Sequence, residues 1–224
     1  SNGRGIMMRD TLRPYISDSI NLPPLNAIDG LIIAFITRRH TIVPLAAKLT
    51  PEQAAAVFML GESIETSAGD PKRVGESIRE VGTNPFIIGD KAYEGNWFYD
   101  FVKQNEGKVS CYQLNTGGIG EIFENQPNGA KTLKRKVQRI EISEMSSIIR
   151  GIARDTIQWG NDKYWNLTTP TNVDGMDMAK YDVEKFYSAD DIKKQVSDLR
   201  AERIAYMEKF KGLDDAIIKA VGAM

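Results

Sequence analysis

The sequence predicts a mixed α/β fold in which helices flank a mixed sheet, and three observations support this prediction. The β-branched run Ile32–Thr37 is typical of a buried strand. A helix signal with both ends marked covers Pro51–Leu60, and a second strand candidate, Val109–Leu114, leads into a glycine-rich turn. The length of 224 residues suits one large domain, so we expect 1–224 to form a single domain.

The N-terminal part is predicted to be extended at first and then to form strands. Turn formers and prolines such as Pro23 and Pro24 break regular structure, so residues 1–27 should form an extended segment. The most apolar stretch, Ile28–Thr37, is far shorter than the roughly 20 apolar residues of a membrane span. We therefore interpret it as a buried strand, and we expect a second short strand at Thr41–Leu45.

The next segment carries the clearest helix signal. Thr50 can cap the helix, Pro51 suits the first helical position, and Gln53 lies three residues after the cap, as in a capping box. The helix should end at Gly61. Glycines and prolines recur over 62–89, which favours a long excursion or paired short elements over one long helix.

The middle of the chain predicts a helix followed by a strand and a turn. The segment 96–105 has amphipathic helix spacing, with Trp97, Phe98 and Phe101 on one stripe and Val102 alongside, and this stripe should pack on a sheet. The strand that follows contains Cys111, which we expect to behave as a small buried hydrophobe. It ends at Asn115–Gly120, and a turn at a strand end is a common place for a ligand.

The C-terminal part is predicted to be mostly helical. A helix should start near Ser143 and carry isoleucines as far as Ile157, after which 160–175 has the composition of a loop. A capped helix is predicted over Ser188–Gly212. We therefore expect 176–224 to form a C-terminal helical segment.

Charge and residue counts exclude several classes of protein. The 29 Lys and Arg against 30 Asp and Glu give a net charge of -1, so no overall field draws the chain to nucleic acid or to a membrane. One cysteine and one histidine leave no ligand set for zinc, and we predict no metal site in this chain. The lone cysteine also favours a reducing, cytoplasmic setting. Phosphate-loop, dinucleotide and zinc-protease motifs are absent from the sequence.

Two features remain as candidates for binding, each with a purely structural alternative. The basic cluster over 131–139 has the composition of a solvated face, but Arg139 also leads the apolar alternation of Ile140 and Ile142. An arginine beside an aliphatic residue can sandwich a planar base. The turn Asn115–Gly120 is either a ligand turn or ordinary punctuation, and His40 is interpreted as a solvated or hydrogen-bonded side chain.

Several segments, in order, resemble the C-terminal part of ATP-dependent phosphoenolpyruvate carboxykinases. The resemblance covers most of residues 2–155. It rests on IDGLIIAFIT (28–37), VPLAAKLTPEQAAAVFMLGE (43–62), SAGDP (67–71), CYQLNTGG (111–118) and RIEIS (139–143). The most specific of these pieces are LTPEQ and LNTGG. The resemblance implies the fold of that C-terminal domain, with a mixed sheet flanked by helices.

The resemblance also implies a reaction and a set of site residues. Members of the family convert oxaloacetate and ATP to phosphoenolpyruvate, CO2 and ADP with the help of Mg or Mn. Arg139 and Ile140 would flank the adenine. Residues Asn115, Thr116 and Gly117 match the family's Asn-Thr-Gly turn and would bind the nucleotide. The tripeptide ending at Arg4 resembles the family's Asn-Thr-Arg, so Arg4 would be the catalytic arginine that clamps the transferred phosphate and the substrate.

Two departures from the family and one missing part leave a second hypothesis open. Met145 stands where the family has a threonine near the adenine, and Gly118 stands where a bulky residue often follows the turn. The family's P-loop and metal ligands lie upstream of the matching region, in a P-loop domain of the same polypeptide. The chain is therefore expected to be inactive alone. The alternative is a non-catalytic regulatory or interaction module that keeps the fold without the activity.

Overall fold

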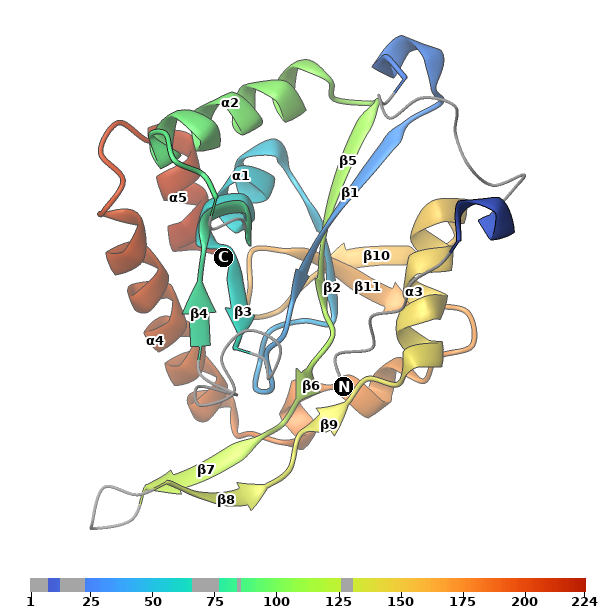
Figure 1. The fold of residues 1–224 in the computed structure, drawn as a ribbon. Coiled ribbons are helices and arrows are strands. Elements are labelled where there is room, and N and C mark those ends of the chain that lie inside the picture. Colours follow the sequence, from blue (N-terminus) through green and yellow to red (C-terminus); the bar gives the residue numbers. More distant parts are fainter. Residues whose placement is uncertain (1–7, 13–22, 66–76, 84–85, 126–130) are drawn as a thin grey trace.

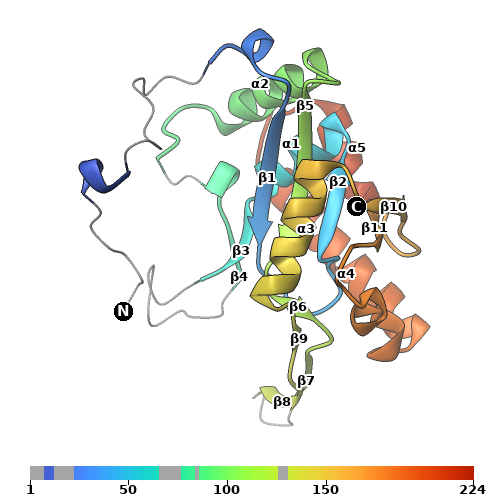
Figure 2. The ribbon, with the colours of Figure 1, turned by 90° about the vertical axis from the view of Figure 1, so that its right-hand side faces the viewer.

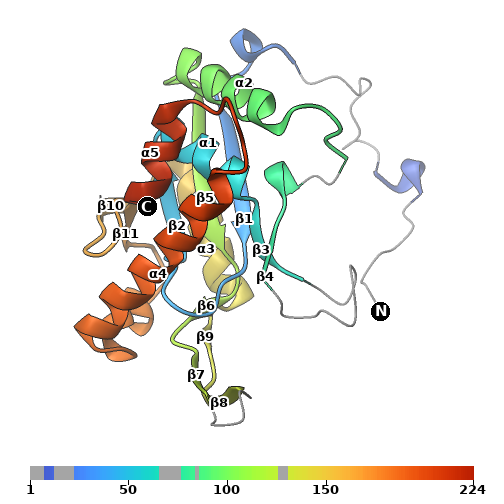
Figure 3. The ribbon, with the colours of Figure 1, turned by 90° about the vertical axis from the view of Figure 1, so that its left-hand side faces the viewer.

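A five-stranded mixed sheet forms the centre of the molecule. The computed structural model describes residues 8–12, 23–65, 77–83, 86–125 and 131–224. The strand order is β1-β5-β2-β11-β10, and β1 runs parallel to β5 while the other neighbours are antiparallel. Helices α1, α2, α4 and α5 cover one face and α3 covers the other (Figures 1, 2 and 3). This arrangement confirms the predicted mixed sheet flanked by helices.

The elements have the following bounds. The sheet strands are β1 Leu31–Thr37, β2 Ala46–Leu49, β5 Val109–Asn115, β10 Gln158–Asn161 and β11 Thr168–Asn172. The two-stranded pairs are β3 Glu62–Ile64 with β4 Ser77–Arg79, β6 Gly118–Ile119 with β9 Gln138–Arg139, and β7 Ile122–Asn125 with β8 Lys131–Arg135. The helices are α1 Pro51–Leu60, α2 Lys91–Gln104, α3 Ile142–Arg154, α4 Ala189–Met207 and α5 Asp215–Ala223.

Short 3-10 turns complete the described structure. They are Arg9–Leu12, Leu25–Ala27, Val81–Thr83, Met178–Tyr181 and Val183–Lys185. Two of them lie inside the segment 1–27 that we expected to be extended, and residues 1–7 and 13–22 of that segment lie outside the described residues. The hairpin β7–β8 projects from one end of the molecule (Figure 1).

Local sequence signals set the ends of two helices as predicted. The Thr50 hydroxyl accepts from the Gln53 main-chain N at 3.3 Å, and the Gln53 side chain accepts from the Thr50 N at 3.1 Å, which completes the capping box of α1. The helix ends at Gly61, whose φ of 47° is left-handed. At the start of α4, the Ser188 hydroxyl accepts from the Asp191 main-chain N.

Three predicted elements were wrong in position or type. The strand expected at Thr41–Leu45 lies instead at β2, because the carbonyls of Ile42 and Val43 accept from the side chains of Trp165 and Asn115 and not from a strand. The expected loop 160–175 contains the second half of β10 and all of β11, whose polar sequence carries no apolar alternation. The C-terminal helix ends at Met207, and the separate helix α5 was not predicted.

Side-chain exposure corrects two further expectations. The strand β1 is not buried on both faces, because it forms the edge of the sheet, and Ile32 and Ile36 are 48% and 51% exposed. Helix α2 begins five residues earlier than expected, after the cap Asp90. Of the predicted stripe, Phe98 and Val102 are buried in an apolar cluster and Phe101 packs against it, whereas Trp97 is 55% exposed and stacks on Phe101.

Two apolar clusters lie on opposite sides of the sheet. One packs α1, α2, α4 and α5 against residues of β5 such as Cys111, and the other packs α3 and Tyr181 against residues such as Tyr112. Cys111 is 2% exposed, which confirms the expected small buried side chain, and burial raises the pKa of its thiol to about 11. The second cluster brings the C-terminal segment next to the start of α3.

Candidate site at the β5–β6 turn and the start of α3

The Asn115 side chain holds together the turn that follows β5. Asn115 is fully buried. Its Oδ1 accepts from the main-chain N of Arg39 at 2.8 Å and of Gly117 at 3.0 Å. Its Nδ2 donates to the carbonyls of Val43 at 3.0 Å and Gly118 at 3.3 Å. Because each polar atom of the amide already contacts main chain, the role of Asn115 in the described structure is to shape the turn.

Thr116 and Gly117 attach the same turn to the end of β1. The main-chain N and the hydroxyl of Thr116 both donate to the Thr37 carbonyl, at 2.9 Å and 3.2 Å. A Cβ on Gly117 would lie 2.2 Å from the Arg39 carbonyl oxygen and 2.8 Å from the His40 ring. Glycine is therefore required here by the close approach of two main-chain segments.

Arg139 lies directly beside this turn. Strand β9 pairs with β6 so that Arg139 is opposite Gly118, and a Cβ on Gly118 would lie 2.1 Å from the Gln138 carbonyl oxygen. Arg139 is exposed, whereas Ile140 is half-buried and packs on the second apolar cluster. The structure thus brings together five predicted site residues from two separate segments. The sixth, Arg4, lies outside the described residues.

The segment after Arg139 is held by residues that sequence reasoning missed. At the start of α3, Glu144 Oε2 accepts from the Glu141 main-chain N at 2.8 Å and from the Tyr181 hydroxyl, and Glu144 Oε1 accepts from Lys180 Nζ at 3.0 Å. The same Tyr181 hydroxyl lies 3.2 Å from the Arg139 carbonyl oxygen. No local signal could have found the two contacts of Tyr181, because 37 and 42 residues separate the partners.

Met145, one of the two departures from the family pattern, faces the core. It is 8% exposed and belongs to the same cluster as Ile148. Its main-chain N donates to the Glu141 carbonyl in the first turn of α3. The position that the resemblance puts near the adenine is therefore filled by an apolar core side chain.

The basic cluster of the sequence divides into two parts. Lys134 and Arg135 lie on the projecting strand β8; Lys134 pairs loosely with Glu124 at 3.7 Å and Arg135 donates to the Phe186 carbonyl. These side chains are exposed to solvent, as a solvated face would be. Arg139 is set apart from them by its pairing with Gly118.

His40 is partly buried beside a carboxylate, and in the described structure its Nε2 is buried without a hydrogen-bond partner, so the expected solvated or hydrogen-bonded side chain is not found at that atom. Its Nδ1 lies 3.3 Å from Glu121 Oε2, and its ring packs beside Gly117. The Glu121 main-chain N donates to the His40 carbonyl. The pair therefore ties the segment after β1 to the segment after the Asn115 turn.

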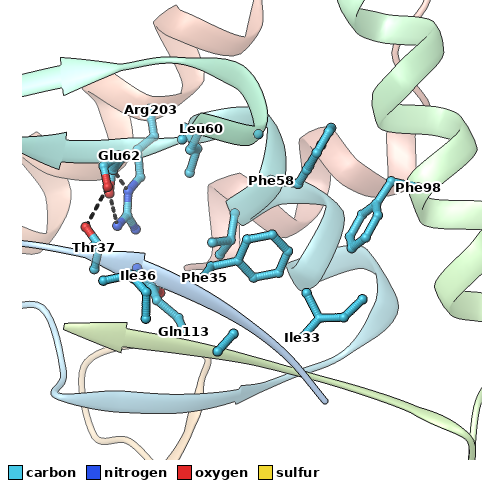
Figure 4. Close-up of a pocket in the computed structure, with 14 residues that line it drawn as sticks. Ile33, Phe35, Ile36, Thr37, Phe58, Leu60, Glu62, Phe98, Gln113 and Arg203 are labelled. Carbon is cyan, nitrogen blue, oxygen red and sulfur yellow. Dashed lines mark hydrogen bonds and ion pairs between the residues drawn. The ribbon is translucent and has the colours of Figure 1, made fainter. Parts of the chain in front are cut away.

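A buried ion cluster centred on Glu62 lies next to Thr37 at the end of β1 (Figure 4). Glu62 Oε1 accepts from Arg39 at 3.1 Å and from Arg79 at 2.8 Å, and Arg203 binds both carboxylate oxygens, at 3.1 Å and 2.8 Å. Burial opposes ionisation of Glu62, but the charges and hydrogen bonds of the three arginines hold its pKa well below its usual range. The Thr37 hydroxyl donates to the Glu62 carbonyl, so this cluster also braces the end of β1.

A cavity of about 370 Å³ opens beside the ion cluster. Its walls are mainly apolar side chains from β1, α1 and α2, with polar groups at one end. The lining includes Ile33, Phe35, Phe58, Phe98, Gln113 and Arg203. In the described ranges, no group of three or more His, Cys, Asp and Glu could hold a metal ion. None of the described helices is long and apolar enough to cross a membrane.

Comparison with known proteins assigns the chain to a family. A profile of the phosphoenolpyruvate carboxykinase family matches residues 1–179. The chain belongs to the phosphoenolpyruvate carboxykinase family. The match includes the Asn115 turn, Arg139 and α3. It ends inside the 3-10 turn Met178–Tyr181.

Individual carboxykinases are distant relatives of the chain. Phosphoenolpyruvate carboxykinase (ATP) of Aeropyrum pernix is 27% identical over 186 residues, which is 83% of this chain and 33% of the relative. The protein of the same name from Rhodopseudomonas palustris strain BisA53 is 24% identical over 227 residues, covering 96% of this chain and 40% of the relative. That from a Chelativorans species is 28% identical over 169 residues, covering 74% and 29%. The chain spans about a third of the length of the carboxykinases that it matches.

Proposed function

We propose that this chain is the nucleotide-side C-terminal domain of an ATP-dependent phosphoenolpyruvate carboxykinase. The whole protein would convert oxaloacetate and ATP to phosphoenolpyruvate, CO2 and ADP, as the names of its relatives suggest. An upstream P-loop domain of the same polypeptide would supply the metal ligands, and bound Mg or Mn would neutralise phosphate charge. We also propose that the protein acts in the cytoplasm and that the chain alone is inactive.

The observation that carries this proposal is the pairing of Arg139 with Gly118 beside the Asn115 turn. An exposed guanidinium on a paired strand can stack flat on an adenine, and its five donors stay in one plane. The half-buried Ile140 offers an aliphatic surface next to it. Within this proposal, Asn115, Thr116 and Gly117 set the position of the nucleotide through the shape of the turn.

The chemistry assigned to the chain is positioning and charge neutralisation. Phosphoryl transfer needs the reacting phosphate held in line, and little covalent work is left for side chains. Arg4 would neutralise charge on the transferred phosphate and on the anionic substrate, in the role implied by the resemblance. The described residues would orient the base end of ATP.

Replacement of Arg139 tests the proposal. In the native gene product, we expect Arg139→Ala to weaken MgATP binding about 5- to 30-fold, the loss of roughly 1–2 kcal/mol of stacking. Arg139→Lys should also weaken binding, because lysine keeps the charge but not the plane. The measurement is the dissociation constant by isothermal titration calorimetry.

Arg135→Ala is the matched control. Arg135 is also an exposed arginine, four residues earlier on β8, and it contacts Phe186 and not the Asn115 turn. Its replacement should leave the MgATP dissociation constant unchanged. An unchanged constant for Arg139→Ala as well would remove Arg139 from the nucleotide site.

A non-catalytic regulatory or interaction module is the second candidate, and Met145 favours it. An apolar core residue occupies the position that the resemblance puts near the adenine. A native gene product that unfolds cooperatively but binds neither MgATP nor MgADP in calorimetry would support this second function over the first.

A further inference from the structure

Tyr181 lies where the C-terminal segment crosses the start of α3. Its ring is 7% exposed and packs in the same cluster as Ile148. Its hydroxyl points at two acceptors on the other segment, the Glu144 carboxylate and the Arg139 carbonyl oxygen, the latter at 3.2 Å. A residue of the C-terminal segment thus contacts the main chain of the proposed adenine-stacking residue.

Both oxygens of the Glu144 carboxylate, which accepts from Tyr181, have hydrogen-bond donors. Glu144 also accepts from the Glu141 main-chain N and from Lys180, and it lies in the first turn of α3, where negative charge is favourable. Burial opposes ionisation of Glu144, but hydrogen bonds from Tyr181 and from the Glu141 backbone, together with Lys180, lower its pKa. Burial and the hydrogen bond to Glu144 raise the pKa of Tyr181, so the proton stays on the phenol at neutral pH.

These contacts fasten both ends of a short connection. On one side, β9 is paired with β6 at Gly118. On the other side, the Tyr181 hydroxyl shares its one proton between the Arg139 carbonyl and the Glu144 carboxylate. The connection runs from Arg139 at the end of β9 to the start of α3, and it includes Ile140. A side chain that stacks on a planar base needs its main chain held within about 0.5 Å.

We propose that Tyr181 is a positioning residue for the nucleotide, acting through the Arg139 main chain and through Glu144. This inference rests on the proposed nucleotide role of Arg139. Tyr181 itself does not contact the nucleotide. The C-terminal segment thereby takes part in nucleotide affinity, although it lies in a different part of the sequence from the predicted site.

Tyr181→Phe in the native gene product tests the inference, because phenylalanine keeps the buried ring and removes the hydroxyl. We expect the dissociation constant and the KM for MgATP to rise about 3- to 10-fold, the effect of one lost hydrogen bond. We expect kcat to change less than about twofold, because the reacting groups are not touched. A merely structural role would not produce this split between KM and kcat.

Tyr99→Phe is a closely matched control. Tyr99 is 5% exposed, and its hydroxyl donates to Glu52 in the first turn of α1 at 3.0 Å, with Lys103 beside it. It therefore has the same three residue types on the other side of the sheet, with the lysine donating to the tyrosine hydroxyl and not to the glutamate. Both replacements should lower the melting temperature by similar amounts, and only Tyr181→Phe should weaken MgATP binding.

The outcomes separate this inference from the proposed function. If Arg139→Ala weakens MgATP binding and Tyr181→Phe behaves like Tyr99→Phe, the role of Tyr181 is overturned and that of Arg139 stands. If Arg139→Ala leaves the MgATP dissociation constant unchanged, the nucleotide role of Arg139 and the positioning role of Tyr181 are both overturned. In the expected case, adding Tyr181→Phe to Arg139→Ala causes no further weakening. Should Tyr181→Phe fail to fold, Glu144→Gln keeps the side-chain size and must raise the KM in the same direction.

Discussion

At the scale of single residues, Glu62 is a buried carboxylate that three arginines contact. Its carboxylate is the shared partner of Arg39, Arg79 and Arg203, and it is 5% exposed. The attraction among these charges offsets the cost of removing them from water as long as each keeps a partner. Removal of the one negative charge leaves positive charges crowded in a poorly hydrated place. The local sequence around position 62 does not predict this cluster.

Glu62→Gln should therefore lower the free energy of unfolding by about 3–5 kcal/mol near neutral pH. Urea unfolding followed by circular dichroism measures this loss. Glu80→Gln is the control, because the Glu80–Lys91 pair is 37% and 34% exposed and such pairs contribute less than about 1 kcal/mol. Equal losses for the two variants would contradict the importance of the buried cluster.

The same cluster predicts a pH dependence. The folded-state pKa of Glu62 is depressed below its ordinary value of 4.5. Its contribution to stability is therefore fully present above the unfolded-state pKa and is lost as the pH falls toward the folded-state pKa. Between about pH 6 and about pH 3, the unfolding free energy of the unmodified protein should fall more than that of Glu62→Gln. Parallel pH profiles would contradict the assignment.

At the scale of elements, the turn between β5 and β6 joins distant segments through their main chains. The Asn115 amide, the Thr116 hydroxyl and the close approach at Gly117 attach it to the segment that follows β1. The sequence predicted a turn with close main-chain approach, and the structure confirms that at Gly117. It could not predict that the approaching main chain belongs to Arg39, which is 76 residues from Asn115.

Gly117→Ala should lower the free energy of unfolding by about 1–3 kcal/mol, because the new methyl group meets a main-chain oxygen that cannot easily move. Gly89→Ala is the control: nothing lies within 4 Å of a Cβ there, so the change should stay within about 0.5 kcal/mol. Thermal unfolding of the two variants side by side gives the comparison. A Gly117→Ala protein as stable as Gly89→Ala would show that the turn can rearrange.

At the scale of the whole molecule, two observations bear on the proposed upstream domain: the exposed edge strand β1 and the chain's share of its relatives' length. Strand β1 leaves Ile32 and Ile36 half-exposed, and within the described part of the chain no further strand pairs with its outer edge. An apolar edge strand in water invites pairing with other chains. The chain also spans about a third of the length of its relatives. Both observations support the proposed upstream domain.

The native gene product is therefore expected to have more than twice the mass of this chain. An antibody raised against the 224 residues, used on extracts of the source cells, measures this directly. We expect the larger product to consume ATP in the presence of oxaloacetate and the chain alone not to do so. This result would support the proposal that an upstream domain supplies the phosphate and metal ligands. A product of the chain's own mass would leave the carboxykinase reaction without its phosphate and metal ligands and would favour the non-catalytic module.

The sequence by itself determined those features that depend on neighbours within a few residues. The capping box at Thr50 and the cap at Ser188 act through contacts three positions apart, and the β-branched run of β1 expresses a local preference for extended backbone, so all three can be read along the chain. Only the tertiary structure decided which distant groups meet. Arg139 beside the Asn115 turn, Tyr181 on Glu144 and three arginines on Glu62 arise from strand pairing and core packing. Such contacts leave no local pattern, because their partners are tens of residues apart.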